Sequence, residues 1–267
     1  MVKIDTEKCV GCGACAADCF PQELELLEGK AVPRGVNCIA CGHCIAVCPA
    51  DAVTLAGYNM GEVLECASLP SRLDPQVYLN HLKTRRSIRR FRDVPVTREQ
   101  LELILEAGRF SPTGGNLQNV SYTVFQKELP ALRTKLIDEL KLMGDEAARA
   151  GQKISWYSDM WLEMYGEYHA QRKDRLFFGA GTAIVIASDS PQSACIAAAH
   201  METMIYSLGL GMLYSGFSAR AIMHSPALQK ELALKENYQV YAVLVVGCPD
   251  VNYLRTVPRK SADVVWR

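Results

Sequence analysis

Eleven cysteines stand out in this chain of 267 residues, and eight of them lie within the first 48. The eight form two runs with the spacing C-x2-C-x2-C-x3-C, and the second run repeats the first 29 residues later. Thiolates at this spacing ligate cubane iron–sulfur clusters, because three sulfurs on a tightly curled loop can point at three corners of one cube. The runs are Cys9, Cys12, Cys15 and Cys19, and Cys38, Cys41, Cys44 and Cys48. The sequence therefore predicts two 4Fe-4S clusters.

The fourth cysteine of each run is predicted to ligate the cluster of the other run, because it opens a helical turn that faces away from its own loop. One cluster is thus expected on Cys9, Cys12, Cys15 and Cys48, and the other on Cys38, Cys41, Cys44 and Cys19. Glycines at positions 11, 13 and 42 lie between ligands, where the backbone must curl tightly. Zinc is disfavoured, since it takes its four thiolates as two separated pairs. Structural disulfides would need an oxidising compartment.

Residues 1–57 resemble two-cluster bacterial ferredoxins and are predicted to form a domain of that type. Pro49 follows Cys48 as in that family, and residues 49–55 resemble its short returning strand. The first run departs from the pattern, because Phe20 is inserted between Cys19 and Pro21.

Composition limits the other possibilities. Basic and acidic groups balance at 29 each, which favours neither nucleic acid nor a membrane surface as partner. The chain opens with charged residues instead of the apolar core of a signal peptide, so we expect a cytoplasmic protein. No apolar stretch reaches the roughly 18 residues of a membrane span.

The remaining elements predict a larger α+β domain over 76–267, after a linker at 58–75 that holds Cys66 as a buried or half-buried free thiol. Helices are expected over 77–86, 98–110, 130–142, 193–208 and 225–233, with one or two more within 145–178, and Thr97 is expected to cap the second. Strands are expected at 122–125, 183–188, near 212–217 and at 241–247. Because strands and helices do not alternate strictly, a mainly antiparallel sheet is favoured.

Four segments of this domain carry groups suited to a flavin nucleotide. Residues 85–92 hold five arginines and one serine, whose guanidinium forks and hydroxyl match phosphate oxygens. The loop 111–119 offers amide groups that could meet the edge of a flavin ring. Two glycines end the predicted helix before 208–217, and 257–266 carries a basic pair. Taken singly, each segment also fits an ordinary structural role. In chain order these roles are a solvated basic face, a polar loop, a helix C-cap and a frayed tail.

Together and in this order, the four segments resemble the FMN-dependent nitroreductase family. The resemblance implies that Arg85, Arg86, Ser87 and Arg89 hold the phosphate and ribityl chain, with Arg259 and Lys260 returning to the phosphate. It places Asn116 at the isoalloxazine ring, with Pro112, Thr113 and Gln118 near it, and it brings Tyr214, Ser215 and Gly216 to the ring from another side. Family members are usually homodimers with FMN at the interface, so a homodimer is expected. The chain departs from the family at Ser215, often acidic there, and at 118–120, often Gln-Pro-Trp.

The fusion predicts an iron–sulfur flavoprotein oxidoreductase. Electrons would pass through the two clusters to FMN and on to an electron-poor acceptor such as a nitroaromatic, quinone or enone, with ferredoxin or NAD(P)H as candidate donor. Two alternatives stay open: an electron carrier between protein partners, and flow from NAD(P)H outward to a ferredoxin. A third keeps the fold but does flavin-destroying or dehalogenating chemistry. No catalytic residue is assigned, because His169, His200 and His224 show no partner in the sequence. The glycines near 179 precede a strand, unlike a dinucleotide-binding loop.

Overall fold

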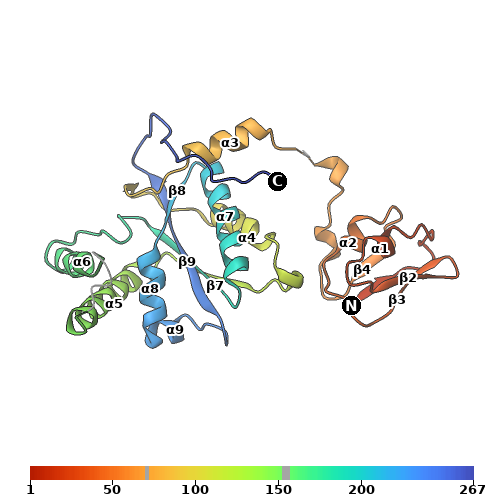
Figure 1. Ribbon diagram of the computed structural model, residues 1–267, viewed down its shortest axis with the longest axis horizontal. Helices are drawn as coiled ribbons and strands as arrows, with labels where there is room; N and C mark the ends of the chain where they lie inside the picture. The colour runs from red at the N-terminus through yellow and green to blue at the C-terminus, as the bar shows by residue number, and fades with distance from the viewer. Residues whose placement is uncertain (70–71, 152–156) are drawn as a thin grey trace. The chain divides into compact units, whose positions relative to one another are not determined.

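The computed structural model describes residues 1–69, 72–151 and 157–267 (Figure 1). The chain divides into two compact units, each treated by itself below. Unit 1 comprises Met1–Asp74 and Thr113–Leu117, and unit 2 comprises Pro75–Pro112 and Gln118–Arg267. Residues 70–71 of the predicted linker and residues 152–156 of the predicted 145–178 segment lie outside the described residues.

Unit 1 is built from two short antiparallel ribbons and two single-turn helices. Strand β1 (Val2–Ile4) pairs with β4 (Val53–Leu55), so the expected returning strand is present. Strand β2 (Leu24–Leu27) pairs with β3 (Lys30–Pro33). The helices α1 (Ala14–Ala17) and α2 (His43–Ala46) each follow a glycine with positive φ, at 76° for Gly13 and 78° for Gly42. The 29-residue repeat of the sequence is thus a repeat of structure.

Unit 2 holds a five-stranded antiparallel sheet. The strands β5 (Phe91–Arg92), β9 (Gln239–Pro249), β7 (Thr182–Ser188) and β6 (Val120–Phe125) pair in that order, and β8 (Gly211–Tyr214) also pairs with β9. All five strands pair antiparallel. The α+β class with a mainly antiparallel sheet, predicted from the sequence, is confirmed.

Helices cover both faces of this sheet (Figure 1). Alternate residues of β7 serve the two faces, with Val185 in one core cluster and Ile184 and Ile186 in the other. The first cluster lies under α5 (Leu129–Arg149), α6 (Tyr157–Gln171), α8 (Gly216–His224) and α9 (Pro226–Glu231). The second lies under α4 (Arg98–Arg109) and α7 (Pro191–Ser207). Burial on both faces explains the unbroken apolar runs of β7 and β9.

Some elements match the sequence prediction and others differ from it. Thr97 caps α4 through a capping box with Gln100, as predicted, and α3 (Pro75–Thr84) matches the first expected helix of this domain. The strand expected near 212–217 was too long, since β8 ends at Tyr214 and α8 starts at Gly216. In the predicted linker, two short 3-10 turns form at Met60–Glu62 and Cys66–Ser68. The Cys66 thiol is exposed, whereas we expected it to be buried or half-buried. Among the described residues, no helix has the length and apolar character needed to cross a bilayer.

A histidine joins α5 to α8 and gives the larger unit a pH-dependent contact. His224 Nδ1 lies 2.6 Å from Glu139 Oε1, and its Nε2 lies 3.0 Å from Glu146 Oε2. Both carboxylates can accept a hydrogen bond from His224 only if both ring nitrogens carry a proton, so the two glutamates favour the imidazolium form. The bond to Glu139, helped by Glu146 and opposed by desolvation, raises the pKa of His224 above its usual value.

Because the folded pKa is raised, the stabilisation is present below the unfolded pKa of about 6.5 and is lost as pH rises through the folded pKa. We expect His224→Gln to lower stability by less than about 1 kcal/mol in mildly acidic buffer, since the groups are partly exposed. The difference should shrink in alkaline buffer, as measured by melting curves against pH. A wild-type advantage that grew with pH would contradict this origin, and Glu139→Gln should flatten the pH profile in the same way.

Candidate functional site

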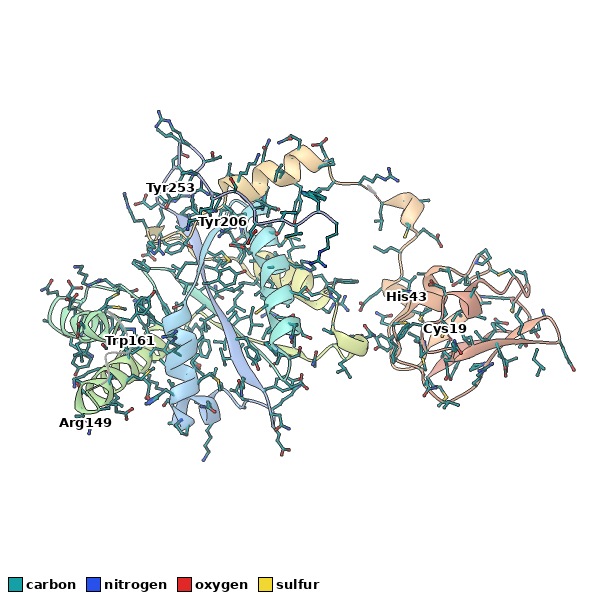
Figure 2. The ribbon with its side chains drawn as sticks, in the orientation of Figure 1. Cys19, His43, Arg149, Trp161, Tyr206 and Tyr253 are labelled. Carbon is teal, nitrogen blue, oxygen red and sulfur yellow. The ribbon has the colours of Figure 1, made fainter. Side chains whose placement is uncertain are left out.

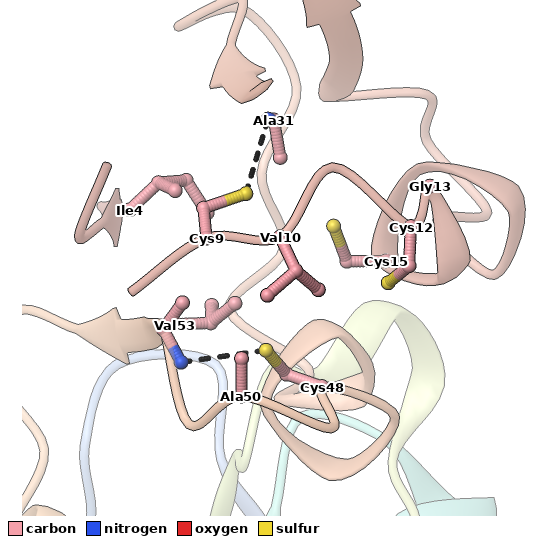
Figure 3. A pocket seen from close by; sticks show the side chains of 11 residues that line it. Ile4, Cys9, Val10, Cys12, Gly13, Cys15, Ala31, Cys48, Ala50 and Val53 are labelled. Carbon is pink, nitrogen blue, oxygen red and sulfur yellow. Dashed lines mark hydrogen bonds between the residues drawn. The ribbon is translucent and has the colours of Figure 1, made fainter. Parts of the chain in front are cut away.

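Four of the eight cysteines surround one pocket of unit 1 (Figure 3). They come from both runs, and they are Cys9, Cys12, Cys15 and Cys48. The pocket encloses ≈ 330 Å³ including space open to solvent, and its other walls are apolar side chains such as Ile4, Val10 and Val53. Helix α1 presents Cys15, while Cys48 lies beyond the end of α2. The first three cysteines of one run therefore meet the fourth of the other.

The other four cysteines surround a second pocket of nearly equal size, ≈ 340 Å³. They are Cys19, Cys38, Cys41 and Cys44. Among the described residues, no three side chains gather as ligands of a single metal ion. The sulfurs instead surround a shared space, as corner ligands of a larger inorganic group do. All eleven cysteines are free thiols, so no disulfide competes for these positions.

The chain can curl around the first pocket because glycine occupies the tightest point. Gly11 has φ 69°, and a Cβ built on it would lie 2.0 Å from the carbonyl oxygen of Gly29. Any side chain at this position would therefore collide with the turn between β2 and β3. The glycine that separates Cys9 from Cys12 is a steric requirement of the loop.

Backbone amides point at the cysteine sulfurs. The amide of Ala31 donates to Cys9 Sγ at 3.5 Å, and the amides of Glu23 and Ala52 donate at 3.3 Å to Cys19 Sγ and Cys48 Sγ. The amide of Ala31 lowers the pKa of Cys9, whereas burial raises the pKa of Cys44 to about 11. Iron binding displaces the thiol proton and leaves thiolates, which these amides stabilise. The residues present fit iron–sulfur clusters.

In unit 2, the basic segment 85–92 and the segment 208–217, both of which the resemblance assigns to flavin binding, meet at the β8 edge of the sheet. Arg85 Nη1 donates to Glu202 Oε1 at 2.9 Å, and the amide of Ile88 donates to the Met212 carbonyl at 2.9 Å. Ser87 forms a bridge with Met212. Burial raises the pKa of Tyr214, and the negative charge of Glu202 adds to the effect. Two segments more than a hundred residues apart thus share one edge.

Arg86 is the group that best fits an anion. Its Nη1 donates to the carbonyls of Lys83 and Arg85 at 2.9 and 2.5 Å. Its Nε and Nη2 are buried and have no hydrogen-bond partner among the described residues. The hydroxyl of Tyr206 accepts from the Arg86 amide at 2.8 Å and so holds the backbone of the same residue. Tyr206 is labelled in Figure 2. Two unpaired N–H donors on a fixed guanidinium fit a phosphate, whose oxygens can accept two parallel hydrogen bonds from them.

The loop 111–119, which the resemblance assigns to the flavin ring, is divided between the units. Pro112 and Gln118 belong to unit 2, and Thr113–Leu117 belongs to unit 1. Within unit 1, Asn116 Nδ2 donates to the carbonyls of Ile39 and Ala40 at 3.3 and 2.9 Å. Those carbonyls lie between Cys38 and Cys41, so Asn116 contacts the loop of the second cysteine pocket. Its expected contact with a flavin ring stays a prediction.

The other expected flavin contacts vary in their surroundings. Ser215 is buried at the junction of β8 and α8, and its Oγ lies 2.7 Å from Ser218 Oγ. Gly216 and Arg89 are exposed. Arg259 and Lys260 lie in an exposed C-terminal segment, and Arg259 donates to the Pro258 carbonyl at 3.5 Å. In the part of the chain that the structure describes, this basic pair makes no polar contact with Arg85–Arg89.

Each histidine considered as a general acid has a partner. His224 bonds to Glu139 and Glu146, and His169 Nε2 lies 2.8 Å from Asp138 Oδ1. His200 Nδ1 lies 2.9 Å from the Ser111 hydroxyl. These contacts join neighbouring elements of unit 2, so none of the three is assigned a catalytic role.

Sequence reasoning missed Glu202, Tyr206 and Glu23. Glu202 is the one carboxylate in the predicted helix 193–208, and a lone carboxylate in a helix expected to be buried indicates a charged partner. Tyr206 follows it by one helical turn. Glu23 lies four residues after Cys19, and nothing in its neighbourhood along the chain marks it out.

Two family models match the chain. The nitroreductase family model matches residues 82–248, and the 4Fe-4S dicluster domain model matches residues 1–50. Ferredoxin-3 of Rhodobacter capsulatus is 31% identical over 22% of this chain and 83% of its own. A nitroreductase with bound FMN from Bacteroides fragilis covers 70% of this chain and 97% of its own, with TM-score 0.55 and 18% identity. A second, from Desulfitobacterium hafniense, covers the same shares with TM-score 0.53 and 23% identity. Both resemblances predicted from the sequence are confirmed.

Proposed function

The chain belongs to the nitroreductase family and carries a 4Fe-4S ferredoxin segment, and from this premise we propose that it is an iron–sulfur flavoprotein oxidoreductase with two 4Fe-4S clusters and FMN. The observation that carries the proposal is the gathering of eight cysteines around two pockets in a chain whose larger unit has the nitroreductase fold. The proposed substrate is an electron-poor acceptor such as a nitroaromatic, quinone or enone. Ferredoxin or NAD(P)H is the proposed donor, and a homodimer is the proposed assembly.

The cysteines would hold the clusters crosswise. Cys9, Cys12, Cys15 and Cys48 would ligate one, and Cys38, Cys41, Cys44 and Cys19 the other. The amides of Ala31, Glu23 and Ala52 would stabilise the thiolates through the hydrogen bonds described above. Clusters supply one-electron transfer and FMN supplies two-electron transfer when bound, so the chain could join a one-electron donor to a two-electron reduction.

The arginines of 85–89 would bind the FMN phosphate. Arg86 supplies two unpaired donors, and Glu202 fixes Arg85 beside it through their ion pair. Ser87 and Arg89 would complete the phosphate and ribityl contacts, with Arg259 and Lys260 from the C-terminal segment. The proposed contacts with the flavin ring are Pro112, Thr113, Asn116, Gln118, Tyr214, Ser215 and Gly216. The buried Ser215 hydroxyl bonds to Ser218, and the Ser215 amide donates to the Val243 carbonyl at 2.8 Å, so the proposed contact of Ser215 with the ring would be one of packing.

The test is anaerobic reconstitution followed by a screen of donors. We expect the purified chain to bind FMN and two four-iron clusters, and we expect bound FMN to bleach when dithionite or reduced ferredoxin is added. Adding a nitroaromatic or quinone should restore the flavin colour with turnover. The proposal fails if Cys9→Ser and Cys38→Ser leave ferredoxin-dependent turnover intact. Reduction by NAD(P)H with electron delivery to oxidised ferredoxin would reverse the proposed direction.

A further inference from the structure

The two cysteine pockets of unit 1 are related by the repeat, but one of them is lined by a buried charged side chain. Glu23 and Ala52 occupy equivalent positions 29 residues apart, four residues after Cys19 and Cys48. Their amides donate to those sulfurs at the same distance, 3.3 Å. Both residues are 2% exposed, and each lines its own pocket. One pocket therefore has a carboxylate where the other has a methyl group.

The Glu23 carboxylate is held by the loop that leads into Cys38. Its Oε1 accepts from the Gly35 amide at 2.6 Å, and its Oε2 accepts from the amides of Val36 and Asn37 at 2.9 and 2.7 Å. Three N–H donors and no oxygen partner suit an ionised carboxylate. A single residue thus contacts both chain segments that supply cysteines to the second pocket.

A charge of opposite sign lies at the first pocket. Lys30 Nζ donates to the backbone carbonyl of Cys9 at 2.5 Å. The neighbouring residue Ala31 donates its amide to the Cys9 sulfur. The strand β3 therefore presents an ammonium and an N–H group to the same cysteine.

These charges act on any group that gains an electron between the cysteines. A reduced cluster carries one more negative charge than the oxidised cluster, so a fixed carboxylate opposes reduction and a fixed ammonium favours it. The Glu23 and Ala52 amide–sulfur bonds are equal in length, so they do not distinguish the two sites. The charged side chains of Glu23 and Lys30 do distinguish the two sites.

We propose that Glu23 and Lys30 set the two clusters at different reduction potentials, with the cluster of Cys38, Cys41, Cys44 and Cys19 the lower. Glu23 lowers the potential of that cluster and positions the loop before Cys38. Lys30 raises the potential of the cluster on Cys9, Cys12, Cys15 and Cys48. The inference rests on the proposed presence of two clusters.

The experiment is a potentiometric titration of the reconstituted full chain, followed by electron paramagnetic resonance. The wild type should show two separated midpoint potentials. Glu23→Gln should raise the lower one, by about a tenfold change in the reduction equilibrium, equivalent to ~59 mV for one electron. Lys30→Gln should lower the higher one by a similar amount, so each substitution narrows the gap between them.

Glu25→Gln is the matched control. Glu25 lies in β2, two residues after Glu23, and its carboxylate pairs with Arg34 at 3.0 Å. Its side chain is 46% exposed, so solvent should screen its charge and the substitution should leave both potentials unchanged. Iron content is measured first, and fewer than two clusters in the wild type would refute the proposed function. If two clusters are present but the difference between their midpoint potentials does not narrow in either variant, only this inference is refuted. If Glu23→Gln does not assemble, the Lys30→Gln shift alone decides.

Discussion

Replacing Cys44 and Cys48 together by serine should abolish both clusters, whereas replacing Cys44 and Cys19 together should abolish one. The pockets explain the difference, because Cys44 and Cys19 line the same pocket and Cys48 lines the other. Serine is a poor iron ligand, so each pocket that loses a thiolate should lose its cluster. We expect the first double variant to lose nearly all bound iron and the second to lose about half. Iron and sulfide analysis with resonance spectra measures both.

This pair of variants is a sharp test of crosswise ligation. Were each run of four cysteines to hold its own cluster, the outcomes would be exchanged, and Cys44→Ser with Cys19→Ser would lose all the iron. Cys66→Ser serves as the control for a changed thiol, since Cys66 is free and exposed and lies outside both pockets. It should retain the full iron content.

The features that sequence could predict are those carried by local spacing. The cluster ligands could be predicted because the eleven residues of each cysteine run determine both the ligand type and the loop geometry. Helix α4 is visible because Thr97 and Gln100 form their capping box three residues apart. Strands β7 and β9 are visible as apolar runs because helices bury both of their faces.

The features that sequence could not predict depend on partners brought together by folding. Glu23 is bonded by backbone amides 12 to 14 residues later, and an amide has no residue type to recognise. Arg85 and Glu202 are 117 residues apart. Helix α8 was missed because Ser215 makes no side-chain cap and the apolar run of β8 continues into the helix. The same dependence on folding leaves Arg259 and Lys260 assigned by resemblance alone.

Arg86→Gln should weaken FMN binding roughly 10- to 100-fold. A charged hydrogen bond to phosphate contributes about 1.5–3 kcal/mol, and each 1.4 kcal/mol is a factor of ten in affinity. Glutamine removes the charge and the fork while keeping a polar side chain. Flavin fluorescence quenching against FMN concentration measures the change. Arg90→Gln is the matched control, because Arg90 is exposed and pairs with Asp250 at 3.3 Å, and it should bind FMN with about wild-type affinity.

Stability separates a binding role of Arg86 from a structural one. The buried Nε and Nη2 make no hydrogen bond among the described residues, and Nη1 bonds only to the nearby carbonyls of Lys83 and Arg85. The cofactor-free protein should therefore lose little when the guanidinium is removed. A ligand that binds only the folded state stabilises it by an amount that grows with the logarithm of the ratio of free ligand concentration to Kd. The added stability that excess FMN gives the wild type should therefore be smaller in the variant, with melting of the cofactor-free forms nearly equal. A variant that melts far lower without FMN, yet binds it normally, would show that Arg86 supports the fold through its bonds to Lys83 and Arg85 instead.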